Sequence, residues 1–283
     1  GGWLTAGLTA PIVGFFTKAV FGASSLEQAQ GKVESVFDKS AGTIIAWSDT
    51  TSRAFGISNA QAMQWTGTIG NFFTSAGLAT EQSAKYSREL IELSADMGAF
   101  NDVSASRASE AIISGMAGEY DSLQRLGINI KASTVEQEGM NIALADGREE
   151  VTEADLALAR YNVIMRESKN QQGQFARESK GFAGQLAILR ARFSEVAASL
   201  GRRLMPYATD FVEMLGRWVE AFDRLSLAMQ RWVIIAGLAA AALGPLLIDA
   251  AGTGRADRFV RGTRLPDRAR CGRGCPAGVR LPG

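Results

Sequence analysis

Residues 80–100 read TEQSAKYSRELIELSADMGAF, and a single amphipathic helix accounts for the whole stretch. Its large apolar residues follow one another at steps of four and three: Tyr86, Leu90, Leu93, Met97 and Phe100. That spacing puts them on one helix face, while charged residues such as Glu81 and Lys85 occupy the others. Thr80 is placed to cap this helix, and Gly77 to end the one before it. A helix of this kind buries its apolar face against other helices.

Helix signals recur through the body of the chain. Ser58 with Gln61, and Thr152 with Asp155, have the spacing of capping boxes, in which two side chains satisfy free amides at a helix start. The chain has only six prolines, and its long runs rich in Ala, Leu, Gln, Glu and Arg also favour helix. We therefore predict an all-α fold: an elongated bundle of long amphipathic helices with one short non-helical insert, followed by a hydrophobic helix and a disordered tail.

Four features are expected to interrupt the helical pattern. Pro11 is placed to open a helix in its first turn. Gly42 is expected to interrupt the helix that it lies in. Residues 118–133 form the insert, and the alternation of apolar and polar residues at 126–130 predicts a short extended segment or a hairpin there. Residues 170–173, NQQG, predict a further break.

Residues 182–222 carry the longest apolar seam of the chain. Its members lie three or four residues apart, with one double step across Pro206, where we expect a kink or a new helix start. A seam of this length favours a coiled coil, and a long helix in a monomeric bundle remains the alternative. We predict self-association through its residues: Phe182, Leu186, Leu189, Phe193, Val196, Leu200, Leu204, Phe211, Leu215, Trp218 and Phe222.

Residues 232–248, WVIIAGLAAAALGPLLI, contain no charged residue. As a helix they would extend about 25 Å, which is at the low end for a segment that spans a bilayer. Two interpretations stay open, a membrane-active segment and a buried core helix. For the first, the contacts with lipid would come from Trp232, Ile235, Leu238, Leu243, Leu246 and Ile248.

The composition changes abruptly after residue 248. Residues 249–283 hold eight Arg, seven Gly and three Pro but no Lys, and show no apolar periodicity. We expect either a disordered basic tail or an out-of-frame end of the reading frame. Cys271 and Cys275 lie in this tail, four residues apart, which is not a redox or metal-binding spacing.

Several classes of chemistry are excluded by composition. The chain contains no histidine, which removes histidine-based acid–base catalysis and most zinc sites. Its net charge is +1, and the body before the arginine-rich tail is slightly acidic, so no electrostatic footprint for nucleic acid is present. No glycine-rich phosphate loop occurs either. We predict no cofactor, no metal site, no sequence-specific nucleic-acid binding and no enzymatic activity.

A series of short blocks carries a family resemblance. In chain order they are Leu93, Ala95 and Asp96 before Phe100, Asn101, Val103 and Ser104; Ser114, Gly115 and Met116; Gly118 and Glu119; Leu123 with Arg125, Leu126, Gly127 and Ile128; Tyr161 and Ile164 before Gly173, Phe175, Ala176 and Arg177; and Leu200 and Gly201 before Leu204, Met205 and Pro206. In this order and spacing they resemble the core region of phage tail tape measure proteins. Met116 departs from the leucine that is commoner in that family.

The resemblance implies a structural protein of a phage or prophage tail that sets tube length. It implies partners as well: the tail tube protein, tail assembly chaperones, further copies of the chain in the tube lumen, and the host inner membrane during DNA ejection. The protein would assemble in the bacterial cytoplasm and lie in the tube lumen of the virion tail. The chain lacks an initiator Met and a signal-peptide n-region, so we expect a fragment of a longer protein.

The expected organisation has five parts: N-terminal helices at 1–56, a tape-measure-like core at 57–181, a long helix kinked near Pro206 at 182–231, a hydrophobic helix at 232–248, and the tail at 249–283. Two other functions remain open. One is a membrane-associated or pore-forming helical protein, based on the apolar segments. The other is a muramidase-like hydrolase, for which Glu119 would need to lie in an apolar pocket.

Overall fold

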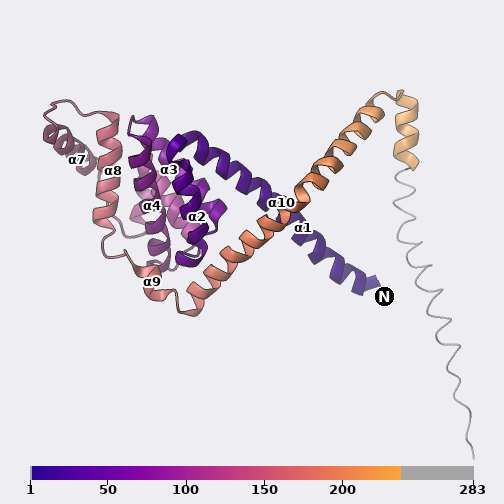
Figure 1. Cartoon of the computed structure of the whole chain (residues 1–283), viewed down its shortest axis with the longest axis horizontal. Coiled ribbons are helices and arrows are strands. Elements are labelled where there is room, and N and C mark those ends of the chain that lie inside the picture. Colours follow the sequence, from indigo (N-terminus) through magenta and orange to yellow (C-terminus); the bar gives the residue numbers. More distant parts are fainter. Residues whose placement is uncertain (1, 237–283) are drawn as a thin grey trace, which may run out of the picture. The chain divides into compact units, whose positions relative to one another are not determined.

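The computed structural model describes residues 2–236, and within them every regular element is a helix, so the all-α prediction is confirmed (Figure 1). The predictions for residues 237–283, which include most of the hydrophobic segment and the tail, lie outside the described residues. The helices are α1 (Gly2–Phe37), the 3-10 turn η1 (Asp38–Ser40), α2 (Ala41–Ala54), α3 (Asn59–Ser75), α4 (Thr80–Phe100), α5 (Ala105–Met116), α6 (Asp121–Gln124), α7 (Ala132–Ala145), α8 (Glu153–Glu167), α9 (Gln174–Glu178) and α10 (Phe182–Asp223).

The chain divides into two compact units. One is Ala10–Glu213, and the other combines Gly1–Thr9 with Met214–Gly283. Helices α1 and α10 each run from one unit into the other. The first unit contains both hydrophobic cores described below.

Helix α4 lies at the centre of the main core, in contact with α3, α5 and α9. Leu90, Leu93 and Met97 from its predicted apolar face are buried. Each such side chain stabilises the fold by about 1.5–3 kcal/mol relative to an exposed one. Tyr86 is half-buried, whereas Phe100 is 50% exposed because it is the last residue of the helix.

A second core joins α1 to α2 and α3, with Val33, Phe37, Ile44 and Met63 at its centre. The ring of Phe37 lies directly against Gly70 of α3. A Cβ atom at position 70 would come within 2.1 Å of the Phe37 Cζ atom, so only glycine lets the two helices approach this closely.

Both predicted capping boxes are confirmed. The Gln61 side chain accepts hydrogen bonds from the Ser58 amide, at 3.4 Å, and the Ser58 hydroxyl, at 3.0 Å. The Asp155 carboxylate accepts from the Thr152 amide at 2.8 Å, and the Asp155 amide donates to the Thr152 hydroxyl at 3.3 Å. Gly77 follows the end of α3 with φ +97°, as the predicted stop requires.

Three predicted helix boundaries are wrong. Thr80 is the first residue inside α4 and not its cap, which is Ala79. Gly42 lies inside α2, and the break comes earlier, where Asp38 adopts φ +46°, a left-handed conformation that aspartate tolerates better than most residues. Pro11 does not open a helix, because α1 already begins at Gly2.

The insert at 118–133 is more helical than predicted. It contains the single-turn helix α6, and α7 begins at Ala132. No hairpin forms, so that alternative is wrong, whereas residues 128–131 are non-helical and Lys131 has an extended conformation. Leu126, Ile128 and Ile130 are buried in the main core. The Gln171 side-chain amide donates to the Leu126 carbonyl at 2.8 Å, which satisfies a backbone group that a strand would otherwise have paired.

Helix α10 runs through Pro206 without interruption, so the expected new helix start there is wrong. Pro206 is exposed, and water can therefore hydrogen-bond the carbonyl that the proline leaves free. The helix was also predicted to continue to residue 231. It ends at Asp223 instead, and another helical stretch begins at residue 227.

Candidate interaction surface

Within the first unit, helix α10 packs against α1 through its small residues. Ala191, Ala198 and Gly201 are buried, and α1 crosses α10 at this face. A Cβ atom at position 201 would lie 1.8 Å from the Ala19 carbonyl oxygen, and one at Gly22 would lie 3.6 Å from the Ala198 Cα atom. The two helix backbones are therefore in direct contact.

Glu195 adds a polar attachment at the same face. Its carboxylate accepts hydrogen bonds from the hydroxyl of buried Ser52, at 2.9 Å, and from the Asn59 amide, at 3.3 Å. Asn59 is the first residue of α3, so the carboxylate also lies at a helix N-terminus, where negative charge is favourable. Glu195 thus holds α10 against α2 and α3.

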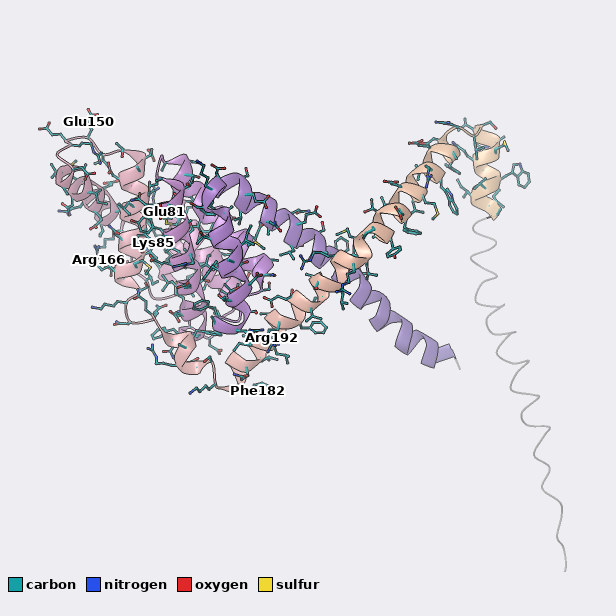
Figure 2. The ribbon with its side chains drawn as sticks, viewed as in Figure 1. Glu81, Lys85, Glu150, Arg166, Phe182 and Arg192 are labelled. Carbon is teal, nitrogen blue, oxygen red and sulfur yellow. The ribbon has the colours of Figure 1, made fainter. Side chains whose placement is uncertain are left out.

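The predicted seam lies on the opposite side of α10 from these contacts. None of its eleven residues is buried: Leu186, Leu204 and Phe222 are half-buried and the other eight are exposed. Phe182 is 84% exposed and Trp218 66%. Figure 2 marks Phe182 at the start of α10 and Arg192 farther along it. The Lys18 ammonium lies 5.9 Å from the centre of the Phe193 ring.

The seam has an internal repeat. Its positions from 182 to 200 recur 22 residues later from 204 to 222, with Ala208 filling the double step across Pro206. The average spacing is close to the 3.6 residues of a straight α-helix rather than the 3.5 of a left-handed coiled coil. The apolar stripe therefore stays on one helix face over 41 residues, which corresponds to about 60 Å of helix length.

Only part of the predicted membrane segment can be placed. Trp232 and Ile235 belong to the helical stretch that begins at residue 227, and both are exposed. Leu238, Leu243, Leu246 and Ile248 lie outside the described residues. Among residues 2–236, no helix combines the length and the apolar character needed to cross a membrane.

The family-like glycines shape the turns around α6. A Cβ atom on Gly115 would lie 2.3 Å from the Leu123 Cδ1 atom, so this glycine lets α6 pack on α5. Gly118 and Gly127 have φ +97° and +79°, conformations that favour glycine. Leu126 and Ile128 between these turns are buried. This motif is therefore part of the core architecture.

Glu119 is exposed, and its carboxylate accepts a hydrogen bond from the Ser114 hydroxyl at 3.2 Å. A glycosidase general acid requires an apolar environment that keeps its carboxyl protonated. The surroundings of Glu119 do not provide one.

Blocks that are far apart in the sequence meet around α4. The Asp96 carboxylate accepts hydrogen bonds from the Gly173 amide, at 2.7 Å, and the Phe175 amide, at 3.0 Å, and so caps α9. The Tyr161 hydroxyl donates to Glu89. Burial, reinforced by this carboxylate, raises the pKa of Tyr161 above its usual range. Two segments are thus tied to α4, the segment at 173–175 through Asp96 and helix α8 through Tyr161.

Asp155, in the acidic stretch at the start of α8, is paired with an arginine. Arg148 donates to Asp155 at 2.6 and 2.7 Å and to Asp146 at 3.0 Å. This guanidinium holds the pKa of the Asp155 carboxyl far below its usual range. Within the described part of the chain, no group of His, Cys, Asp and Glu side chains has a metal-binding arrangement.

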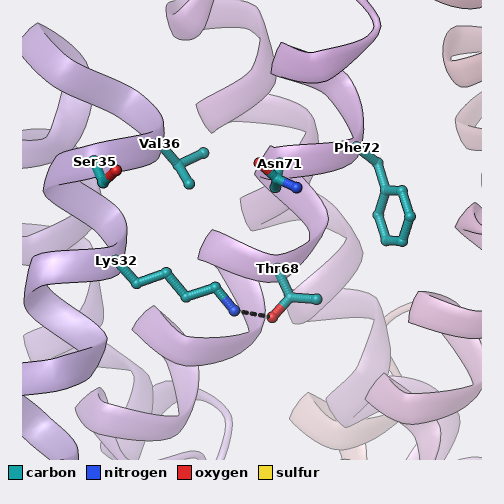
Figure 3. Close-up of a pocket in the computed structure, with 6 residues that line it drawn as sticks. All are labelled: Lys32, Ser35, Val36, Thr68, Asn71 and Phe72. Carbon is teal, nitrogen blue, oxygen red and sulfur yellow. Dashed lines mark hydrogen bonds between the residues drawn. The ribbon is translucent and has the colours of Figure 1, made fainter.

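Two hollows lie in the first unit. One of about 380 Å³ lies between α1 and α3, where the Lys32 ammonium donates to the Thr68 hydroxyl at 2.6 Å (Figure 3). Partial burial lowers the pKa of Lys32. A groove of about 740 Å³ runs beside α10 and is lined mainly by small residues such as Gly56, Ala99 and Ala187. Among the described residues, four have a buried side-chain atom without a hydrogen-bond partner, and all four lie outside this groove.

Sequence reasoning identified the exposed seam but missed the opposite face of α10. The signal for that face was a second set of small residues at helical spacing: Gly184, Ala187, Ala191, Ala198 and Gly201. In water-soluble helices such residues are common at many positions, so their pattern alone did not indicate a close helix crossing.

Comparison with protein-family models, curated proteins and solved structures finds no match for this chain.

Proposed function

We propose that this chain is part of a phage or prophage tail tape measure protein, a structural protein that determines how long the tail tube grows. The observation that carries the proposal is helix α10, which has 42 residues and an apolar seam in which eight of the eleven residues are exposed. A soluble protein rarely exposes an apolar stripe of this length unless another surface covers it. In a tail tube, the covering surface would be a second copy of the chain or the inner wall of the tube.

The interlocked sequence blocks support the same proposal. The resemblance to tape measure proteins rests on short motifs distributed over more than one hundred residues. Asp96, Tyr161 and Gly115 all contribute to one folded core around α4 and α5. A set of motifs that depend on one another in this way is expected of a single inherited domain.

The fold also bears on how a tape measure protein of this kind would determine tail length. The residues before α10 fold back on themselves around α4, so they do not extend by 1.5 Å per residue as one straight helix would. Tail length would depend on the number of residues in long helices such as α10. The folded part would add a fixed length to the tail.

The test is an insertion series in the full-length gene of the phage that encodes the protein. One, two or three further copies of residues 202–223 are inserted after Asp223, which preserves the seam repeat. Each copy is expected to lengthen the tail by about 33 Å, measured by electron microscopy. The matched control inserts segments of equal length into the loop at 147–150 of the folded part, where tail length should not increase with insert length.

A membrane-associated protein is the second candidate, favoured by the exposed apolar residues Trp232, Val233 and Ile235. It predicts that the chain binds vesicles of bacterial inner-membrane lipid. Replacement of these three residues by serine should abolish that binding. Vesicle binding combined with unchanged tail length in the insertion series would favour this candidate over the ruler.

A further inference from the structure

The spacing along the seam of α10 reads the same in both directions. With Ala208 included, the steps from Phe182 to Phe222 are four, three, four, three, four, four, four, three, four, three and four. A helix with this pattern can lie antiparallel to a copy of itself so that every seam position meets a seam position. The two-fold axis of that arrangement passes beside Arg202.

The residue types match as well as the positions. In the antiparallel register Leu200 lies opposite Leu204, Leu189 opposite Leu215, and Phe182 opposite Phe222. Phe193 pairs with Phe211, Leu186 with Trp218, and Val196 with Ala208. Four of the six pairs therefore join identical residue types, which gives layers of even width along the interface.

Charge along α10 is divided between its two halves. Residues 182–203 hold four arginines, Arg190, Arg192, Arg202 and Arg203, and one acidic residue, Glu195. Residues 204–223 hold four acidic residues, Asp210, Glu213, Glu220 and Asp223, and one arginine, Arg217. An antiparallel pair brings the basic half of each helix to the acidic half of the other, whereas a parallel pair in register brings like charges together.

We propose that the occupant of the α10 seam is a second copy of this chain, paired antiparallel about a two-fold axis beside Arg202. Arg192 of each copy then lies near Asp210 of the other, at the margin of the apolar stripe. Arg203 lies close to its own copy at the axis, and the repulsion between the two guanidinium groups opposes pairing, so Arg203→Gln should strengthen the dimer. The helix macrodipoles also oppose each other in this arrangement, which is favourable.

The inference depends on the seam and the charges of α10, and it extends the proposed function by naming the partner and its orientation. A closed antiparallel pair does not form an open-ended ruler, so it describes the free protein before tail assembly. A chain that does not dimerise would contradict the antiparallel pair but not the proposed role in tail length. Tails of unchanged length would contradict that role but not the antiparallel pair. The two proposals can therefore be judged separately.

Disulfide cross-linking tests the orientation in the full chain. Cys271 and Cys275 are first changed to serine, and Leu189→Cys and Leu215→Cys are then introduced in separate proteins. Mixing the two under mild oxidation should give a disulfide between position 189 and position 215. Each protein alone should give little, because in the antiparallel pair a residue at 189 lies about 39 Å from its copy. Efficient cross-linking of Leu189→Cys to itself would overturn the proposal.

Sedimentation equilibrium of the full chain tests whether the α10 seam is the dimer interface. Leu200→Glu should weaken dimerisation at least about 100-fold, because it places a charge in the apolar layer beside the axis. Val212→Glu is the matched control: Val212 is 64% exposed on the same helix but lies off the seam, and its substitution should leave the dimer unchanged. Circular dichroism confirms that both variants keep their helix content. A wild-type chain that stays monomeric, or equal effects of both variants, would overturn the proposal.

Exchanging the charges of Arg192 and Asp210 distinguishes an antiparallel from a parallel dimer by its effect on dimer affinity. Arg192→Asp should weaken the dimer by about tenfold, and Asp210→Arg should do the same. The double variant Arg192→Asp with Asp210→Arg should recover wild-type dimerisation, because the pair is restored with its signs exchanged. In a parallel pair Arg192 lies beside basic residues, so Arg192→Asp would strengthen the dimer, and that result would contradict the antiparallel arrangement.

Discussion

At the scale of single residues, Gly201 is the position at which the α1–α10 contact is most sensitive. An added Cβ atom would collide with the Ala19 carbonyl, which belongs to the backbone and cannot move aside as a flexible side chain can. We expect Gly201→Ala to destabilise the chain by about 1–3 kcal/mol in urea unfolding.

The control for this substitution lies on the same helix. A Cβ atom on Gly216 would meet nothing within 4 Å, so Gly216→Ala should stabilise the helix by about 0.5–1 kcal/mol. If both substitutions stabilised the chain, the close crossing of α1 and α10 would be wrong.

Asp155 combines a helix cap with an ion pair. It completes the capping box with Thr152 and receives Arg148, while its own carboxyl is almost inaccessible to solvent. Asp155→Ala should cost about 1–2 kcal/mol of unfolding free energy. Glu153→Ala removes an exposed carboxylate from the same first turn and should cost much less.

The same carboxylate predicts a pH dependence. Because Arg148 lowers the pKa of folded Asp155, its contribution is fully present above the unfolded value of about 3.9 and is lost as pH falls from there toward the folded value. Thermal unfolding measured from pH 6 to pH 2 should therefore show a smaller loss of stability in Asp155→Ala than in wild type. Parallel curves would contradict the role of this ion pair.

At the scale of elements, Glu195 determines how firmly α10 is held. Glu195→Ala removes hydrogen bonds to Ser52 and Asn59, and we expect faster amide hydrogen exchange in the first half of α10 and at the start of α3. Glu213→Ala, an exposed position on the same helix, should leave exchange there unchanged. Equal exchange in both variants would show that the small-residue face alone attaches the helix.

The elements also show what the sequence could predict. Capping boxes were sufficient for the starts of α3 and α8, and regular spacing was sufficient for the apolar face of α4, because local chemistry determines these features. The region around Leu126 was misjudged, because alternation also arises when an irregular segment passes over a core. The break at Asp38 had no clear local signal, since it depends on a left-handed aspartate and not on a glycine.

The candidate surface was predictable in part. The seam of α10 was found by its spacing, and its residues were expected to associate with another helix. Sequence alone could not show that the opposite, small-residue face would attach α10 to its own chain, because that depends on the approach of α1 at Ala19 and Gly22. Only with that contact known does the seam become the outward face.

At the scale of the whole molecule, the core around α4 and helix α10 differ in how they treat apolar residues. The part around α4 buries its apolar residues and forms a stable folded domain. Helix α10 instead leaves its apolar seam exposed and separates its charges between two halves. Under the proposed function, the exposed seam would complete its contacts in an assembly.

The most direct test of the proposed function is tail length as a function of the number of residues inserted after Asp223. We predict a linear increase of about 1.5 Å per residue over the series of one to three copies of residues 202–223, and no increase for equal insertions at 147–150. Tails that keep their wild-type length across the α10 series would contradict the claim that this chain belongs to a tape measure protein.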